Sequence, residues 1–185
     1  MWDDMEIKIV RSRRKTISMQ ILGGDLIVKV PRYLSRSEIQ SFLQKHRQWI
    51  EKHARKAETA QPPLSAEELQ KLTEQAKSVF SERVAFYAPM VGVTYGRISI
   101  RHQRTRWGSC SAAGNLNFNC LLMLAPPEVL DSVVVHELCH RKEMNHSRRF
   151  YEEVLRVFPE YEKWHRWLKD NGTSLMSRLP QDNKK

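Results

Sequence analysis

The chain has 185 residues, enough for one domain with a small appendage, and its 41% hydrophobic and 28% charged residues are ordinary for a soluble globular protein. The lack of any apolar stretch of 18 residues argues against a transmembrane helix, and the acidic start does not resemble a secretory signal. The formal net charge of +10 favours anionic partners such as nucleic acid, nucleotides or acidic proteins, although a solvated basic face would carry the same charge.

The first predicted element is a β-hairpin. Hydrophobic and polar residues alternate over 16–21 and again over 26–30. Gly23-Gly24-Asp25 lies between the two runs, and this composition is typical of a hairpin turn. Pro31 should end the second strand.

A helix should follow the hairpin. Ser35 and Glu38 have the spacing of a capping box, and hydrophobic residues then recur at helical spacing as far as Ile50. His46 falls on the apolar face of this helix, so we interpret it as a packed residue and not a metal ligand. The hairpin and helix together form a predicted N-terminal subdomain, residues 1–60.

A long second helix is predicted after a linker at 57–64 that contains two consecutive prolines. A second capping box, formed by Ser65 and Glu68, marks the start of this helix. Pro89 and Gly92 should close it.

A second β unit is expected after this helix. Hydrophobic residues alternate at 98–102 and 116–122, with a turn at 111–115. We expect strand 116–122 to lie at a sheet edge and border the active-site cleft. Pro126-Pro127-Glu128 should then start a helix that runs to about residue 142.

Two shorter helices, about 148–157 and 160–170, should follow, and Asn171-Gly172 has the composition of a helix C-cap. We therefore expect a catalytic domain at 65–172, a mobile tail at 173–185, and an α+β fold for the whole chain. Three aromatic residues at helical spacing are interpreted as core packing: Tyr161, Trp164 and Trp167.

The segment His136-Glu137-Leu138-Cys139-His140 is an H-E-x-x-H motif. On a helix, residues four apart lie on the same face, so the two imidazoles could bind one zinc ion. Glu137 could then act as general acid and base on a metal-activated water without being a ligand. An apolar stripe at Leu130, Val134 and Leu138 should place the histidines on the opposite, cleft-facing side of the helix.

His146 is the predicted third ligand. A straight helix would carry it about 9 Å beyond His140, so the chain must turn back after the motif. Asn145 tolerates the left-handed conformation that such a turn can need, and Ser147 could cap the next helix. The alternatives for the third ligand are Glu152 and Glu153.

Three nitrogen ligands and an open fourth position describe a catalytic zinc site. A structural zinc would need a fourth protein ligand, and Cys139, the nearest thiol, should point away from His140. The chain has three cysteines, Cys110, Cys120 and Cys139. This odd number in a chain without a secretory signal predicts reduced thiols and a cytoplasmic location.

The segment 104–111 combines arginines, a tryptophan and hydroxyl groups just before the strand that precedes the motif. Arg104, Arg106 and Trp107 are therefore candidates for substrate binding, with an arginine stabilising oxyanion charge. The alternative is a strand end and a turn around a packed tryptophan.

These residues together resemble the YgjP-like metallopeptidases, which are zincins related to the SprT-like and WLM groups. The resemblance rests on Trp107-Gly108-Ser109-Cys110-Ser111, Asn117, the H-E-x-x-H segment, and Asn145-His146-Ser147 with Phe150. It covers about residues 7–170. It implies a zincin fold, zinc on His136, His140 and His146, Glu137 as acid/base, and a bacterial cytoplasmic protein. Asn117 joins Arg104, Arg106 and Trp107 as a candidate for substrate binding.

The substrate is left open between a peptide and a nucleoside triphosphate, because some members of this group are described as acting on UTP. A triphosphate would need cationic groups close to the metal. The candidates, which flank the motif in sequence, are Arg104, Arg106, Arg141, Arg148 and Arg149. A third hypothesis is a basic nucleic-acid-binding module with a structural metal, but such a module would have no need of Glu137. We expect no membrane partner.

Overall fold

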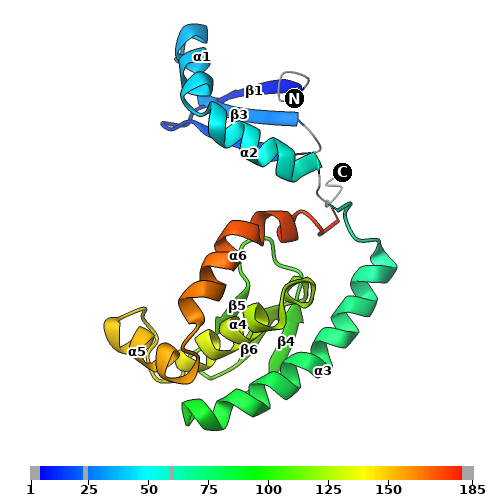
Figure 1. Cartoon of the computed structure of the whole chain (residues 1–185), viewed down its shortest axis with the longest axis vertical. Helices are drawn as coiled ribbons and strands as arrows, with labels where there is room; N and C mark the ends of the chain where they lie inside the picture. Colours follow the sequence, from blue (N-terminus) through cyan, green and yellow to red (C-terminus); the bar gives the residue numbers. More distant parts are fainter. Residues whose placement is uncertain (1–4, 23–24, 59–60, 181–185) are drawn as a thin grey trace. The chain divides into compact units, whose positions relative to one another are not determined.

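The computed structural model describes residues 5–22, 25–58 and 61–180 (Figure 1). The chain divides into two compact units, Met1–Gln61 and Pro62–Lys185, each with its own hydrophobic core. Both units combine helices with a three-stranded sheet, so the α+β class predicted from the sequence is confirmed. Within the described residues, no helix has both the length and the apolar character required to cross a lipid bilayer.

The N-terminal unit has three strands followed by two helices. They are β1 (Ile7–Ser12), β2 (Ser18–Leu22), β3 (Asp25–Pro31), α1 (Arg36–Lys45) and α2 (Arg47–Glu58). The predicted hairpin is present as antiparallel β2 and β3, and its turn residues Gly23 and Gly24 lie outside the described residues. The sequence pattern does not predict β1, which lies parallel to β3 at one edge of the sheet.

The predicted first helix is in fact two helices. His46 leaves the helical conformation, with φ −105° and ψ 15°, and separates α1 from α2. Its half-buried ring lies 4.1 Å from the ring of Phe42, and its Nδ1 is 2.7 Å from the Phe42 carbonyl oxygen. The histidine therefore packs, as expected, but at a break between two helices and not in the middle of one.

The C-terminal unit holds the H-E-x-x-H motif. Its elements are α3 (Ala66–Val91), β4 (Ile98–Arg101), β5 (Gly108–Cys110), β6 (Leu116–Asn119), the 3₁₀-helix η2 (Cys120–Leu124), α4 (Pro127–Cys139), α5 (Arg148–Val157) and α6 (Tyr161–Met176). The predicted capping box of α3 is present, and Gly92 closes this helix with a φ of 78° in the left-handed region.

The sheet of this unit has the strand order β4-β6-β5, with β4 parallel and β5 antiparallel to β6. The prediction that strand 116–122 lies at an edge is therefore wrong, because β6 is the central strand. The strand is also shorter than predicted. The side-chain oxygen of Asn119 accepts a hydrogen bond from the Leu121 N–H (3.1 Å) and starts η2 at that point.

The motif helix α4 is buried on almost every side, including all residues from Val129 to Val135. It contacts α3, α5, α6, η2 and β5 (Figure 1). The predicted one-sided apolar stripe is therefore only part of its packed surface, and the helix ends at Cys139, before the predicted residue 142. As a result, α4 is a rigid central element from which the histidines extend.

The last helix, α6, continues through Asn171 and Gly172 to Met176, so the predicted C-cap at Asn171-Gly172 is wrong. Gly172 serves packing instead, because a Cβ at this position would lie 3.1 Å from the Trp107 ring. Beyond the helix, Leu179 is buried. Residues 181–185 of the predicted tail lie outside the described residues.

Candidate metal centre

Three histidines meet at the end of α4. His136 and His140 lie one helical turn apart, as their spacing predicts, with ring centroids separated by 4.9 Å. The helix then ends, because the N–H of Arg141 donates to the carbonyl of Leu138 (3.0 Å), three residues back instead of four. The chain turns back and brings His146 to the same place, with its Nε2 atom 3.0 Å from the Nε2 of His136.

The turn uses ordinary backbone conformations. Among the described residues, only glycines have positive φ, so Asn145 does not adopt the expected left-handed conformation. Ser147 is the N-cap of α5, as predicted, and its hydroxyl accepts a hydrogen bond from the Phe150 N–H (3.3 Å). The centroid of the buried Phe150 ring lies between 4.6 and 4.9 Å from the ring centroids of all three imidazoles. Phe150 therefore packs against the whole cluster.

Two of the imidazoles are anchored through Nδ1. The Nδ1 of His136 is 2.8 Å from the Tyr161 hydroxyl, and the Nδ1 of His140 is 3.0 Å from the Glu143 carbonyl oxygen. These contacts leave each Nε2 for a metal, as in many metal sites where outer groups fix the histidine tautomer. The ligand atoms of the three histidines lie within 4.8 Å of one another, which fits a single divalent ion.

Tyr161 was expected to be a packing residue, and no spacing in the sequence links it to His136. We expect Tyr161→Phe to lower zinc affinity about 10- to 100-fold, because the imidazole loses the group that orients it while the ring packing remains. Competition with a chromophoric chelator measures this affinity. His165→Ala is the matched control: His165 lies 3.3 Å from the same hydroxyl but outside the cluster. An unchanged affinity in Tyr161→Phe would mean that Tyr161 only packs.

Burial favours the neutral forms of the groups in the site. It is the main cause that lowers the pKa of His136 to about 3, helped by His140, His146 and His165. Burial also lowers the pKa of His140. Neutral imidazole is the form that binds a metal. Burial raises the pKa of Glu137 to about 8, so this carboxyl is poised to exchange a proton near neutral pH.

Glu137 lies directly against the edge strand β5. A Cβ at Gly108 would come within 2.5 Å of its Oε1 and 2.7 Å of its Cγ, so only glycine leaves room for the carboxylate. No spacing in the sequence links this glycine to Glu137, because the contact joins residues almost 30 positions apart. The lack of a side chain at Gly108 therefore allows the Glu137 carboxylate to lie against β5, at the edge of the sheet.

We expect Gly108→Ala to lower kcat about 10²-fold while leaving zinc content unchanged. The added methyl group would displace the Glu137 carboxylate, and a shift of about 1 Å in a reacting group can cost this much. Metal analysis and peptide turnover on the same preparation check this result. Gly96→Ala is a suitable comparison, since Gly96 lies beside Asn115 and not beside Glu137. Full activity in Gly108→Ala would show that the carboxylate has other space available.

The candidate substrate-binding residues do not all gather at the histidines. Arg104 donates hydrogen bonds to the carbonyl oxygens of Leu179 (3.4 Å) and Pro180 and so holds the segment after α6. Trp107 packs against Gly172, which matches the alternative interpretation of a packed tryptophan. Arg106 is exposed.

Asn117, the fourth candidate, lies on β6. Its amide donates to the Ser109 hydroxyl (3.1 Å), and its side-chain oxygen accepts from Arg101 (3.2 Å). Asn117 thus connects the side chains of β4, β6 and β5. It supports the edge strand that carries Gly108.

The arginines considered for triphosphate binding are partly engaged elsewhere. Arg141 donates to the carbonyl oxygens of Thr94 (3.1 Å) and Ala112 (2.9 Å), and it lines a surface hollow of about 520 Å³ that includes no histidine of the cluster. Arg148 forms an exposed ion pair with Glu152 (2.7 Å). Together with Arg104, three of the five candidates contact other groups.

The two alternative third ligands also have other partners. Glu152 pairs with Arg148, and Glu153 forms ion pairs with Arg156 and Lys142, both at 2.6 Å. The hydrogen bonds from Arg156 and Lys142 hold the pKa of Glu153 at about 2. Neither carboxylate belongs to the histidine cluster.

A structural metal with a thiolate ligand has little support from the geometry. Cys139 is fully buried, and burial raises its pKa to about 12. It does not belong to the metal-binding cluster. Cys110, Cys120 and Cys139 are all free thiols.

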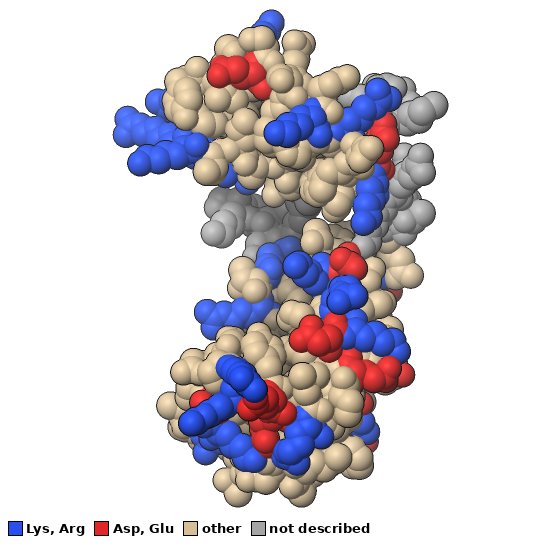
Figure 2. Space-filling model, turned by 60° about the vertical axis from the view of Figure 1, so that its left-hand side comes forward, with Lys and Arg blue, Asp and Glu red and all other residues tan. Residues whose placement is uncertain are grey.

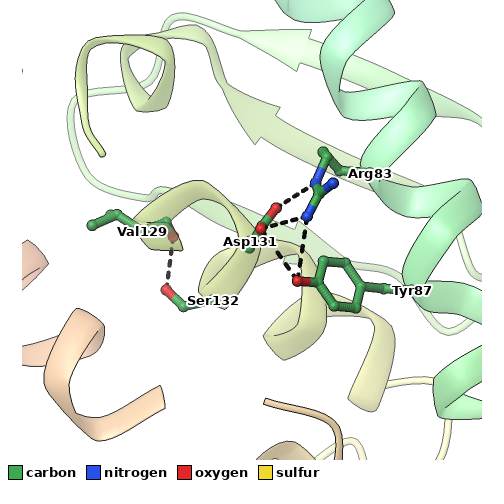
Figure 3. Close-up of polar contacts among 5 residues, drawn as sticks. All are labelled: Arg83, Tyr87, Val129, Asp131 and Ser132. Carbon is green, nitrogen blue, oxygen red and sulfur yellow. Dashed lines mark hydrogen bonds and ion pairs between the residues drawn. The ribbon is translucent and has the colours of Figure 1, made fainter. Parts of the chain in front are cut away.

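A polar network fixes α4 from the side of α3 (Figure 3). The Asp131 carboxylate accepts two hydrogen bonds from Arg83, at 2.6 and 2.5 Å, and one from the Tyr87 hydroxyl at 3.2 Å. Arg–carboxylate pairs of this bidentate kind are directional as well as strong. Asp131 lies five residues before His136, so the network fixes the rotation of the helix that presents the ligands.

Residues 15–71 and 64–171 match the family model described as "YgjP-like, metallopeptidase domain". A search of curated proteins finds no match. Similar solved structures include the metallopeptidase zymogens of Pyrococcus abyssi abylysin and Methanocaldococcus jannaschii jannalysin, at 21% and 20% identity, both with a TM-score of 0.45. These two matches cover 49% and 50% of this chain and 93% and 95% of those chains.

Proposed function

Because the chain belongs to the family of YgjP-like metallopeptidases, we propose that it is a zinc-dependent hydrolase that cleaves peptide bonds. In this proposal His136, His140 and His146 hold the metal, and Glu137 is the general acid and base. The observation that carries it is the convergence of three imidazoles at the end of α4, the helix that also carries the buried Glu137.

The chain's own residues supply most of the chemistry. Zinc bound to three histidines would act as a Lewis acid on water and on the substrate carbonyl. Glu137 takes a proton from the attacking water and delivers it to the leaving amine. Tyr161 and the Glu143 carbonyl hold two of the imidazoles in the orientation that ligation needs.

An extended peptide has a place to bind along β5. This strand pairs with β6 on one side and has no other strand partner among the described residues. An extended substrate can add to such an edge through main-chain hydrogen bonds. Because β6 is the central strand, the edge available to a peptide is β5, Gly108–Cys110, next to Glu137.

A direct test compares substrates on zinc-loaded protein. We expect cleavage of casein or of a library of quenched-fluorescent peptides, inhibited by chelator and restored by zinc. UTP and other nucleoside triphosphates should be turned over slowly or not at all. The triphosphate hypothesis has less support, because Arg104, Arg141 and Arg148 contact other groups. Turnover of UTP without any peptide cleavage would contradict our proposal.

A further inference from the structure

The N-terminal unit carries most of the chain's net positive charge. Residues 1–61 contain 13 Lys and Arg against 7 Asp and Glu, a net charge of +6 out of the total of +10. This unit is half the size of the catalytic unit and contains none of the metal-site residues. Its charge therefore calls for an explanation other than catalysis.

The sheet topology concentrates basic residues at one end of this unit. Strands β1 and β3 are parallel, and Ser12 pairs with Pro31, so both strands finish at the same end of the sheet. The connections 13–17 and 32–35 begin at this end. Arg11, near the end of β1, donates hydrogen bonds to the carbonyl oxygens of Arg32 (3.0 Å) and Leu34 (2.6 Å) and so connects β1 to the segment 32–35. We call the resulting cluster the basic end; it consists of Arg11, Arg13, Arg14, Lys15, Arg32 and Arg36.

Four acidic residues of this unit have polar partners within it: Glu6, Asp25, Glu38 and Glu51. Lys8 pairs with Asp25 (2.6 Å) and Glu6 (3.3 Å). Arg47 pairs with Glu51 (2.8 Å), and Glu38 is held by Ser35 in the capping box of α1. Figure 2 shows Lys and Arg side chains projecting from the N-terminal unit, with few acidic ones among them. The contact with Ser35 places the Glu38 carboxylate at the basic end, where six cations outnumber it.

An aromatic ring lies within this cluster. Tyr33 follows Arg32 in the turn after β3 and is 76% exposed, the largest exposure among the big hydrophobic residues in the described part of the chain. A ring with this exposure contributes little to folding. It does offer a flat surface on which a nucleotide base can stack.

We propose that the basic end binds single-stranded nucleic acid, with phosphates on the arginines and Lys15 and one base stacked on Tyr33. Single strands fit better than duplexes, because both faces of a base inside a duplex are already stacked on its neighbours. Contacts to phosphates and stacking on one base do not depend on the base sequence or on the sugar. RNA and DNA should therefore both bind. This surface is independent of the zinc site and would bring the hydrolase close to nucleic acid.

The test uses the full-length, zinc-loaded protein and fluorescein-labelled oligo-U and oligo-dT of 12 nucleotides. With four phosphate contacts, fluorescence anisotropy should show affinity falling about 50-fold between 50 and 200 mM salt, given a slope of about −0.7 per phosphate for single strands. Arg13→Glu combined with Arg32→Glu should lower affinity at least about 10-fold. The matched control, Lys45→Glu with Lys52→Glu, changes the charge equally on α1 and α2 and should have little effect.

Tyr33→Ala should weaken binding about 10-fold and reduce the salt slope little, whereas Tyr33→Phe should bind like the wild type. Thermal melting and peptide hydrolysis should be unchanged in all these variants. Equal losses in the two charge-reversal doubles would overturn the proposal, because net charge alone would then explain the binding. Binding to phosphatidylserine vesicles but not to oligonucleotides would overturn it in favour of a membrane surface.

Discussion

Glu137→Gln should lower kcat for peptide cleavage by about 10²- to 10⁴-fold, the usual contribution of a positioned general acid and base. Glutamine has almost the same shape, so it should still fit against Gly108, but it cannot accept the proton of the attacking water. Zinc content should remain one ion per chain, because Glu137 is not part of the ligand cluster. Turnover of a quenched-fluorescent peptide and metal analysis on the same sample measure both quantities.

Glu152→Gln is the matched control for this substitution. Glu152 is an exposed residue of the neighbouring helix and pairs with Arg148, so the variant should keep both its activity and its zinc. Two results would count against the assignment. If Glu137→Gln lost its zinc, the carboxylate would be a ligand, and if it kept full activity, another group would have to move the proton.

The sequence predicts the local parts of this site well. The one-turn spacing of His136 and His140 follows from helix geometry, and the capping of α5 by Ser147 follows from side-chain chemistry within three residues. The helices of the second half and the strands β4 and β6 likewise follow from local pattern, whereas β5 was not predicted. These features need no knowledge of which distant segments meet.

The parts that depend on distant contacts are the ones that the sequence misses. Tyr161 anchors His136 from 25 residues away, and Gly108 makes room for Glu137 from another strand. Neither contact produces a recognisable spacing of residues in the sequence. The central position of β6 depends on how three short strands are ordered, and a single strand's pattern of hydrophobic residues does not record that order.

The arginines show the same limitation in another way. They flank the motif in sequence, which suggested that they flank the metal in space. Arg141 follows His140 directly, yet its guanidinium bonds to carbonyls near residues 94 and 112, because successive residues at a helix end point in different directions. Proximity in sequence is therefore poor evidence for a shared substrate site.

His146→Ala should lower zinc affinity by more than about 10²-fold. Loss of an outer partner of a ligand commonly costs 10- to 100-fold, so loss of a ligand itself should cost more. The Nε2 of His146 is 3.0 Å from that of His136, and its ring rests on Phe150, so removal opens one side of the cluster. Chelator competition gives the affinity, and the rise in melting temperature on adding zinc gives a second measure that does not depend on activity.

Glu152→Ala and Glu153→Ala provide the comparison, because these residues are the alternative third ligands. Both variants should keep wild-type zinc affinity, since Glu152 pairs with Arg148 and Glu153 with Lys142 and Arg156. Glu153→Ala should lower the melting temperature even without zinc, because it leaves two cations without their partner. Its zinc-induced rise in melting temperature should nevertheless equal that of the wild type. A variant of either glutamate that loses this rise, with His146→Ala retaining it, would transfer the third position to that carboxylate.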